Sequence, residues 1–255
     1  MAIRNPVRHA LLGRTLTVGT WIQAGHAAVA EVLANVGFDW IAADCEHTDI
    51  DISAFTTLAR GMHGRGCVPM ARVRENDTLA IRQVLDMGAQ GVIVPLIDTP
   101  AAARKAVQAA KYPPEGVRGF AFSRMNNWGV DFDEYVRTAN DDIAVVAMIE
   151  SSRAVDTIDD ILAVDGIDGV FIGPYDMSGS YGVPGETGRP KVKEGCARVV
   201  AACERAGKSA GIHVVIPTQE SVNDAVDAGF TFIGLGVDTV FLDRGARAAL
   251  KCVRS

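Results

Sequence analysis

The sequence of 255 residues has few cysteines and no pattern that would join them. Its five cysteines are irregularly spaced and include no CxxC pair. Disulfide frameworks use an even, ordered set of cysteines, and structural zinc sites use close Cys and His pairs. We therefore expect reduced thiols in a cytoplasmic protein, and we expect no zinc site.

Long apolar runs and basic clusters are also missing. No apolar segment approaches the roughly 20 residues that cross a bilayer, and residues 1–16 lack a long apolar stretch ending in a cleavage site. The net charge is −6, without a run of Lys and Arg. These absences argue against a membrane or a nucleic acid as partner.

Several catalytic signatures are absent too. There is no Gly-x-Ser-x-Gly motif of a serine hydrolase. The segment TWIQAGHAA carries one glycine where a nucleotide-binding fold would show a glycine-rich loop. No lysine falls at an inward strand position suited to a Schiff base, because all of them lie in predicted helices or loops: Lys105, Lys111, Lys191, Lys193, Lys208 and Lys251.

What the sequence does contain is one repeated unit, a short apolar strand followed by a helix with a 3.6-residue period. The predicted strands are 17–22, 40–46, 68–73, 91–97, 143–150, 168–173, 209–214 and 231–237. Helical patterns include 26–37, 51–64, 77–88, 151–164 and 218–229, and several helices end at a glycine: Gly37, Gly64, Gly88, Gly207 and Gly229. Eight such units at this length predict a single (β/α)₈ barrel domain over residues 1–255. An open, doubly wound sheet is the alternative.

Ionisable residues gather where the predicted strands end, which is where barrel enzymes place their catalytic groups. One strand ends in Asp44, Glu46 and His47, the next in Arg72, and two later ones in Glu150 and Asp176. His213 ends a further strand.

Each of these residues also has a structural explanation. The two later carboxylates suit helix N-termini, Arg72 can neutralise Asp44, and His47 can be an ordinary loop residue. Together, however, two carboxylates from adjacent strands can bind a divalent cation beside a proton-transferring histidine and an arginine for a developing oxyanion.

The sequence resembles the HpcH/HpaI aldolase family of metal-dependent pyruvate aldolases over nearly its whole length. The matching segments are GFDWIAADCEH, ARV, IRQVLDMGAQGVIVPLIDT, AAKYPPEGVRGF, MIES, DGIDGVFIGPYDMSGSYG and AGFTFIGLGVDTVFL. The resemblance implies reversible cleavage of 4-hydroxy-2-oxo acids to pyruvate and an aldehyde through a pyruvate enolate.

The resemblance also implies roles. It makes His47 the catalytic base, Arg72 the residue that stabilises the transition state, and Glu150 and Asp176 the ligands of Mg²⁺, Mn²⁺ or Co²⁺. Asp44 matches an acidic residue beside the histidine. Asp86 matches an aspartate that raises the basicity of the histidine, although it precedes a strand and an ideal barrel places it at the opposite rim.

The residues expected to contact the substrate are Arg72, Met148, Gly173, Tyr175, Asp176 and His213. Two of them depart from the family pattern, since Met148 stands where a glutamine is common and Tyr175 where an alanine is common. We expect these departures to affect pyruvate binding little, whereas they leave the character of the aldehyde pocket unpredicted.

Three alternatives remain at this point: an oxaloacetate decarboxylase, a CoA-ester lyase of the same superfamily, and a catalytically silent barrel that binds a small acid. The resemblance further implies a homo-oligomer, a hexamer whose C-terminal helices are exchanged between subunits. The apolar face of TVFLDRGARAALKCV is also compatible with an ordinary last helix.

Overall fold

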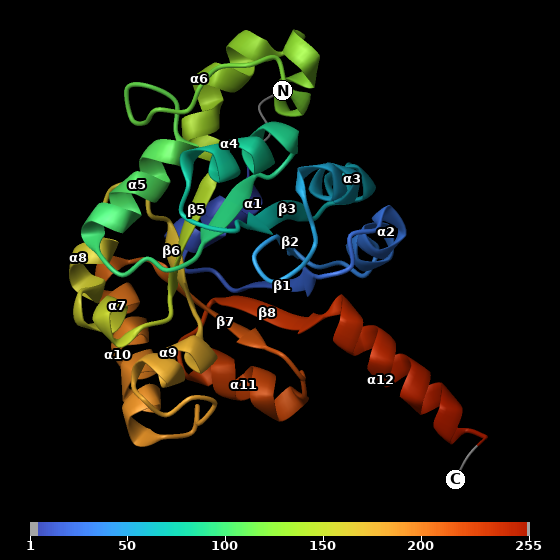
Figure 1. Ribbon diagram of the computed structural model, residues 1–255, viewed down its shortest axis with the longest axis vertical. Helices are drawn as coiled ribbons and strands as arrows, with labels where there is room; N and C mark the ends of the chain where they lie inside the picture. Colours follow the sequence, from blue (N-terminus) through green and yellow to red (C-terminus); the bar gives the residue numbers. More distant parts are fainter. Residues whose placement is uncertain (1–4, 254–255) are drawn as a thin grey trace.

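In the computed structural model, which describes residues 5–253, the chain forms a closed barrel of parallel strands in the order β1 to β8 (Figure 1). The strands are β1 (Thr17–Ile22), β2 (Trp40–Asp44), β3 (Val68–Arg72), β4 (Gly91–Val94), β5 (Ala144–Ile149), β6 (Gly169–Ile172), β7 (Ser209–Val214) and β8 (Phe232–Val237). Each strand pairs with the next, and β8 pairs with β1. The predicted (β/α)₈ fold is confirmed, and the open-sheet alternative is wrong.

Helices follow the strands along the chain, and most of them cover the outside of the barrel. They are α1 (Pro6–Gly13), α2 (Ala27–Ala34), α3 (Ile52–Met62), α4 (Thr78–Met87), α5 (Pro100–Ala110), η1 (Arg124–Gly129), α6 (Phe132–Asp142), α7 (Ser152–Asp156), α8 (Ile158–Leu162), α9 (Pro174–Ser180), α10 (Pro190–Ala206), α11 (Gln219–Asp227) and α12 (Asp238–Lys251). Gly207 ends α10 at φ +66°, a left-handed conformation that glycine adopts without strain.

The predicted helix over 151–164 is wrong in one respect, because the structure has two short helices there. The break falls at Thr157, whose φ of −107° and ψ of 16° are not helical. Its hydroxyl donates to the carbonyl oxygens of Asp98 and Arg153, at 3.0 and 3.1 Å. Threonine side chains that bond to the backbone in this way compete with regular helix geometry.

The interior of the barrel is filled by aromatic rings. Trp40 packs on Phe232 with ring centroids 4.3 Å apart, and Phe171 meets Trp21 edge to face at 5.4 Å. The β1 backbone approaches the Trp40 ring so closely that a Cβ at Gly19 would lie 2.0 Å from it. With the start of the barrel covered by α1, this packing makes the interior a solid core and leaves its other end for a site.

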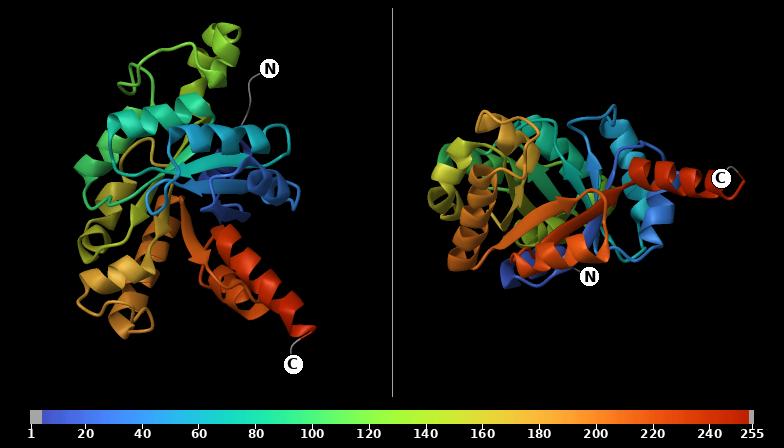
Figure 2. Two further views of the ribbon diagram at one scale, coloured as in Figure 1. Left: turned by 45° about the vertical axis from the view of Figure 1, so that its right-hand side comes forward. Right: turned by 90° about the horizontal axis from the view of Figure 1, so that it is seen from below.

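The C-terminal helix α12 does not fold back onto the barrel. Figures 1 and 2 show it extending away from the strands, and Leu242 and Leu250 are exposed on it. Exchange of this helix between subunits stays a prediction. Within residues 5–253, none of the helices combines the length and the apolar character that a bilayer crossing requires.

Candidate active site

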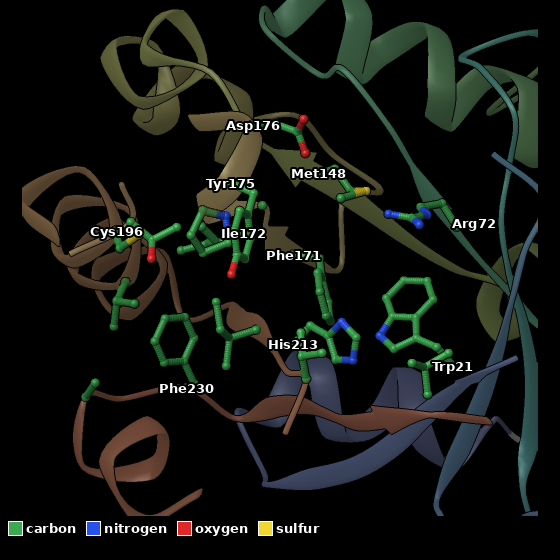
Figure 3. Close-up of a pocket in the computed structure, with 18 of the residues that line it drawn as sticks. Trp21, Arg72, Met148, Phe171, Ile172, Tyr175, Asp176, Cys196, His213 and Phe230 are labelled. Atoms are coloured by element: carbon green, nitrogen blue, oxygen red, sulfur yellow. The ribbon is translucent and has the colours of Figure 1, made fainter. Parts of the chain in front are cut away.

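The ends of the strands bring the predicted site residues to one mouth of the barrel. Asp44 and Arg72 are the last residues of β2 and β3, and Glu150 directly follows β5. A cavity of about 700 Å³ opens there (Figure 3). Seven of the residues predicted for the site line it: Asp44, Arg72, Met148, Gly173, Tyr175, Asp176 and His213.

Arg72 is held in place by a two-pronged ion pair with Asp44. Its Nη2 lies 2.7 Å from Oδ2 of Asp44, and its Nε donates to Oδ1 at 3.0 Å. Burial alone would raise the pKa of Asp44, but the hydrogen bonds and charge of Arg72, together with the backbone N–H of His47, keep that pKa below its ordinary value. An arginine has five N–H donors, so this pair leaves others free to face the cavity.

The pair between Asp44 and Arg72 is therefore structural, which is one of the explanations that the sequence offered, and it also positions the guanidinium group of Arg72. The guanidinium carbon of Arg72 lies 4.9 Å from the centre of the Trp21 ring, which fixes the plane of the group further. In Figure 3 Arg72 points toward Met148 at one end of the cavity. A fixed cation of this kind can stabilise an oxyanion without reorganising.

His47 lies at the rim, with its side chain 59% exposed, and it does not line the cavity itself. Its neighbour is Glu46, whose Oε2 lies 3.3 Å from His47 Nε2 and also 3.3 Å from Arg72 Nε. Oε2 makes no hydrogen bond of acceptable geometry, and its contact with Arg72 is an ion pair. A carboxylate thus lies between the two groups predicted to act on the substrate.

Glu150 is almost fully buried, with 5% of its surface exposed. The backbone N–H of Leu96 donates to its Oε1 at 2.7 Å, and Leu96 adopts a φ of +55° to do so. Burial raises the pKa of Glu150, and the nearby carboxylates of Glu46 and Asp176 raise it further. The ionised group is costly in this position unless a cation accompanies it.

This donor set fits a hard divalent cation. Mg²⁺ binds through one or two carboxylates and keeps its other positions for water and substrate oxygens. Glu150 and Asp176 supply two such carboxylates, and the pKa of Glu150 is raised by burial and by neighbouring carboxylates, although the charge of Arg72 acts in the opposite direction. Among residues 5–253 no cluster of three or more His, Cys, Asp or Glu side chains could hold a metal, so a cation on Glu150 and Asp176 would need other ligands, such as water or substrate oxygens.

Met148, Tyr175 and His213 occupy distinct parts of the cavity wall. Met148 is 3% exposed and belongs to the barrel core as well as to the wall, whereas Tyr175 is 66% exposed. His213 Nε2 lies 2.8 Å from the carbonyl oxygen of Gly236, and burial lowers the pKa of its ring. With its Nε2–H donating to that carbonyl, neutral His213 presents an acceptor nitrogen on the other side of the ring.

Asp86 is the predicted residue that the chain does not bring to this mouth. It lies in the last turn of α4, before β4 begins, and so at the opposite end of the barrel. Its Oδ1 pairs at 2.7 Å with Nη2 of Arg118, a buried arginine that packs over Tyr112. Within one chain, then, Glu46 and not Asp86 is the carboxylate beside His47, and the role implied for Asp86 stays a prediction.

Among the wall residues that were not predicted, two lie beside Asp44 and Arg72. Gln23, directly after β1, donates through Nε2 to Oδ2 of Asp44 at 3.3 Å, and its backbone N–H is fixed by Asp238 at 2.9 Å. Trp21 lies beside it and contacts both Arg72 and His213. Both stand at the end of the predicted strand 17–22, and strand ends are where we expect site residues. Neither is ionisable, so a pattern of ionisable residues does not reveal them.

Comparison with known proteins identifies relatives along almost the whole chain. Residues 17–243 match the family model of the HpcH/HpaI aldolase/citrate lyase family. The chain is 37% identical over 247 residues to the hydroxypyruvate/pyruvate aldolase of Deinococcus radiodurans, covering 96% of this chain and 88% of that protein. It is 35% identical over 248 residues to the 4-hydroxy-2-oxo-heptane-1,7-dioate aldolase of Salmonella typhimurium, covering 96% and 93%.

A solved structure from the same family has the same fold. The crystal structure of an HpcH/HpaI aldolase/citrate lyase family protein from Burkholderia cenocepacia J2315 matches this chain with a TM-score of 0.93 at 33% identity. The match covers 98% of this chain and 100% of that one.

Proposed function

The chain belongs to the HpcH/HpaI aldolase/citrate lyase family, and on that premise we propose that it is a divalent-metal-dependent aldolase. Its reaction would be the reversible cleavage of 4-hydroxy-2-oxo acids to pyruvate and an aldehyde. The observation that carries the proposal is the meeting, at one mouth of the barrel, of an arginine fixed by Asp44 with the carboxylates of Asp176, which lines the cavity, and Glu150, which lies behind the lining residue Gly173.

A divalent cation held by Glu150 and Asp176 would supply a Lewis acid that polarises the 2-oxo group and orients the substrate. Arg72 donates its free N–H groups to the substrate oxygen on which negative charge develops. His47, reaching the cavity through a water molecule, accepts the proton of the 4-hydroxyl group as the C3–C4 bond breaks. The aldehyde leaves, and a proton delivered to C3 of the remaining enolate gives pyruvate.

One lysine has to be considered for the competing Schiff-base chemistry. Lys193, from α10, lines the cavity, although the sequence placed it only on a helix. It is exposed to solvent, whereas lysines that form Schiff bases are activated by desolvation or by a neighbouring cation. Borohydride treatment in the presence of pyruvate should therefore leave no adduct on the protein, and chelation should abolish activity until Mg²⁺, Mn²⁺ or Co²⁺ is restored.

The proposal is tested by exchange of the pyruvate methyl protons in D₂O with Mn²⁺-loaded protein. A barrel that only binds a small acid would show no exchange. We expect Arg72→Ala to lower the exchange rate by about 100-fold or more. Arg74→Ala is the matched control, since Arg74 lies two residues further on, is exposed and does not line the cavity.

Decarboxylation of oxaloacetate and cleavage of a CoA ester use the same enolate, and the family description includes citrate lyases. A panel of aldehydes with pyruvate, run beside oxaloacetate alone, separates these activities, because only an aldolase consumes the aldehyde. For the assembly we propose a homo-oligomer, a hexamer, in which α12 packs on a neighbouring subunit. Light scattering of the intact chain measures its mass directly.

A further inference from the structure

The cavity is larger than the reaction at its inner end requires. Pyruvate and a short aldehyde are small molecules, whereas a volume of about 700 Å³ is typical of pockets for drug-sized ligands. In Figure 3 Arg72, with Met148 and Trp21 near it, lies toward one end. Cys196 and Phe230 lie at the other end, and nothing in the proposed mechanism uses them.

This second end has an apolar wall, which we call the outer half. It is formed by side chains from β6, α10, β7 and the segment before β8: Ile172, Cys196, Ala197, Val200, Ile212 and Phe230. None of the six carries a charge. Burial raises the pKa of Cys196 to about 11, so its thiol stays neutral and behaves as a small apolar group.

The polar lining of the outer half is limited to residues that water already reaches. Thr187 is half-buried, and Lys193 and Tyr175, which lies beside Ile172 in Figure 3, are exposed. Ile172, Val200 and Phe230, in contrast, are at most 8% exposed. Burial of this apolar wall stabilises a complex only when the apolar surface of a ligand covers it and removes both surfaces from water.

We propose that the outer half binds the aliphatic chain of the acceptor aldehyde, so that the enzyme favours unbranched aldehydes of medium chain length over short ones. The product of such a reaction is a single chain, with its 2-oxo acid end at Arg72 and its alkyl end against Val200 and Phe230. This inference rests on the proposed aldolase function and adds the class of aldehyde that it uses.

The test is a chain-length series with pyruvate and the Mg²⁺-loaded wild-type protein: acetaldehyde, butanal, hexanal and octanal. We expect kcat/KM to rise by about threefold to fourfold for each added methylene up to hexanal, as complete burial of the chain implies. A flat or falling series would overturn the inference while acetaldehyde turnover still supported the aldolase. No turnover with any aldehyde would overturn both.

A matched pair of variants locates the effect. Ala197 and Ala201 are both exposed on α10, one turn apart, but only Ala197 lines the cavity. Ala197→Phe should lower kcat/KM for hexanal by about tenfold or more and leave acetaldehyde within about twofold, because the ring occupies space that only the longer chain needs. Ala201→Phe should leave both unchanged.

Light scattering of both variants completes the experiment. We expect the mass of wild-type protein in each case. If Ala197→Phe changed the mass and left the chain-length preference intact, the outer half would be a contact between copies of the chain, and the inference would be wrong. The wild-type series decides the question even if Ala197→Phe fails to fold.

Discussion

Replacing Gly173 by alanine is a direct test of where the structure places the carboxylate of Glu150. The added Cβ would lie 3.0 Å from the Cβ and 3.2 Å from the Oε2 of Glu150, closer than the 3.4 Å at which ordinary contacts begin. Glu150 would have to move by a few tenths of an ångström. The N–H of Leu96, 2.7 Å from Oε1, opposes that movement.

The expected consequence is weaker cation binding in a folded protein. Gly173 has a φ of −105°, which alanine adopts without strain, so the backbone need not change. Disturbing the groups that orient a metal ligand typically lowers metal affinity by about 10–100-fold. A single tight contact at a partly exposed position costs about 1 kcal/mol of the free energy of unfolding.

Isothermal titration of metal-free protein with Mn²⁺ measures the affinity, and urea unfolding measures the stability. The matched control is Gly179→Ala in the same helix α9, where an added Cβ meets nothing within 4 Å. We expect this control to bind Mn²⁺ as the wild type does. Wild-type affinity in Gly173→Ala as well would refute the reasoning, because the displaced carboxylate could then not be a ligand.

Three further substitutions probe the same mouth. Glu150→Gln should raise the melting temperature of the metal-free protein by a few degrees, because the wild-type carboxylate is buried and its raised pKa makes the fold lose stability as pH rises and the group ionises. The variant should also lose the stabilisation that Mn²⁺ gives the wild type. An unchanged melting temperature would contradict the electrostatic argument. Asp44→Asn should lower the free energy of unfolding, measured in urea, by about 1–3 kcal/mol at pH 5. The wild-type protein should lose more of this free energy than the variant between about pH 5 and pH 3, because the lowered pKa of Asp44 stabilises the fold above its ordinary value of 3.8 and that contribution is lost as pH falls through the folded-state pKa. An equal loss in both proteins would speak against the ion pair with Arg72. Met148→Gln should lower the KM for pyruvate by up to about fivefold, the effect of one net hydrogen bond, whereas an unchanged KM with a lower melting temperature would show that Met148 only packs the core.

The fold and most of the mouth could be predicted from the sequence because both follow from position along a strand. Arg72 and Glu150 stand at the ends of apolar runs, and in a parallel barrel those ends meet at one rim. The strand boundaries differ from the predicted ones by a few residues at most.

The contacts that hold the charged groups could not be predicted in the same way. Leu96 donates to Glu150 only because its backbone adopts a φ of +55°, and a leucine gives no sign of a left-handed conformation. Glu46 follows the same strand as Asp44, but the path of the turn decides that its carboxylate faces Arg72 and His47. Turn geometry of this kind depends on tertiary packing.

The outer half of the cavity could not be predicted from the sequence for a different reason. Val200 on α10 and Phe230 before β8 have the apolar character and the spacing of ordinary helix and strand residues that pack around a barrel. Whether such residues fill the core or line a cavity depends on how far the helix stands from the strands, and hydrophobic periodicity carries no information about that distance. The same is true of Lys193, which is one more charge on a helix in the sequence and a wall residue in the structure. If the outer half binds the aldehyde as proposed, acceptor preference depends on the position of α10, and the charged residues Arg72, Glu150 and Asp176 do not decide it.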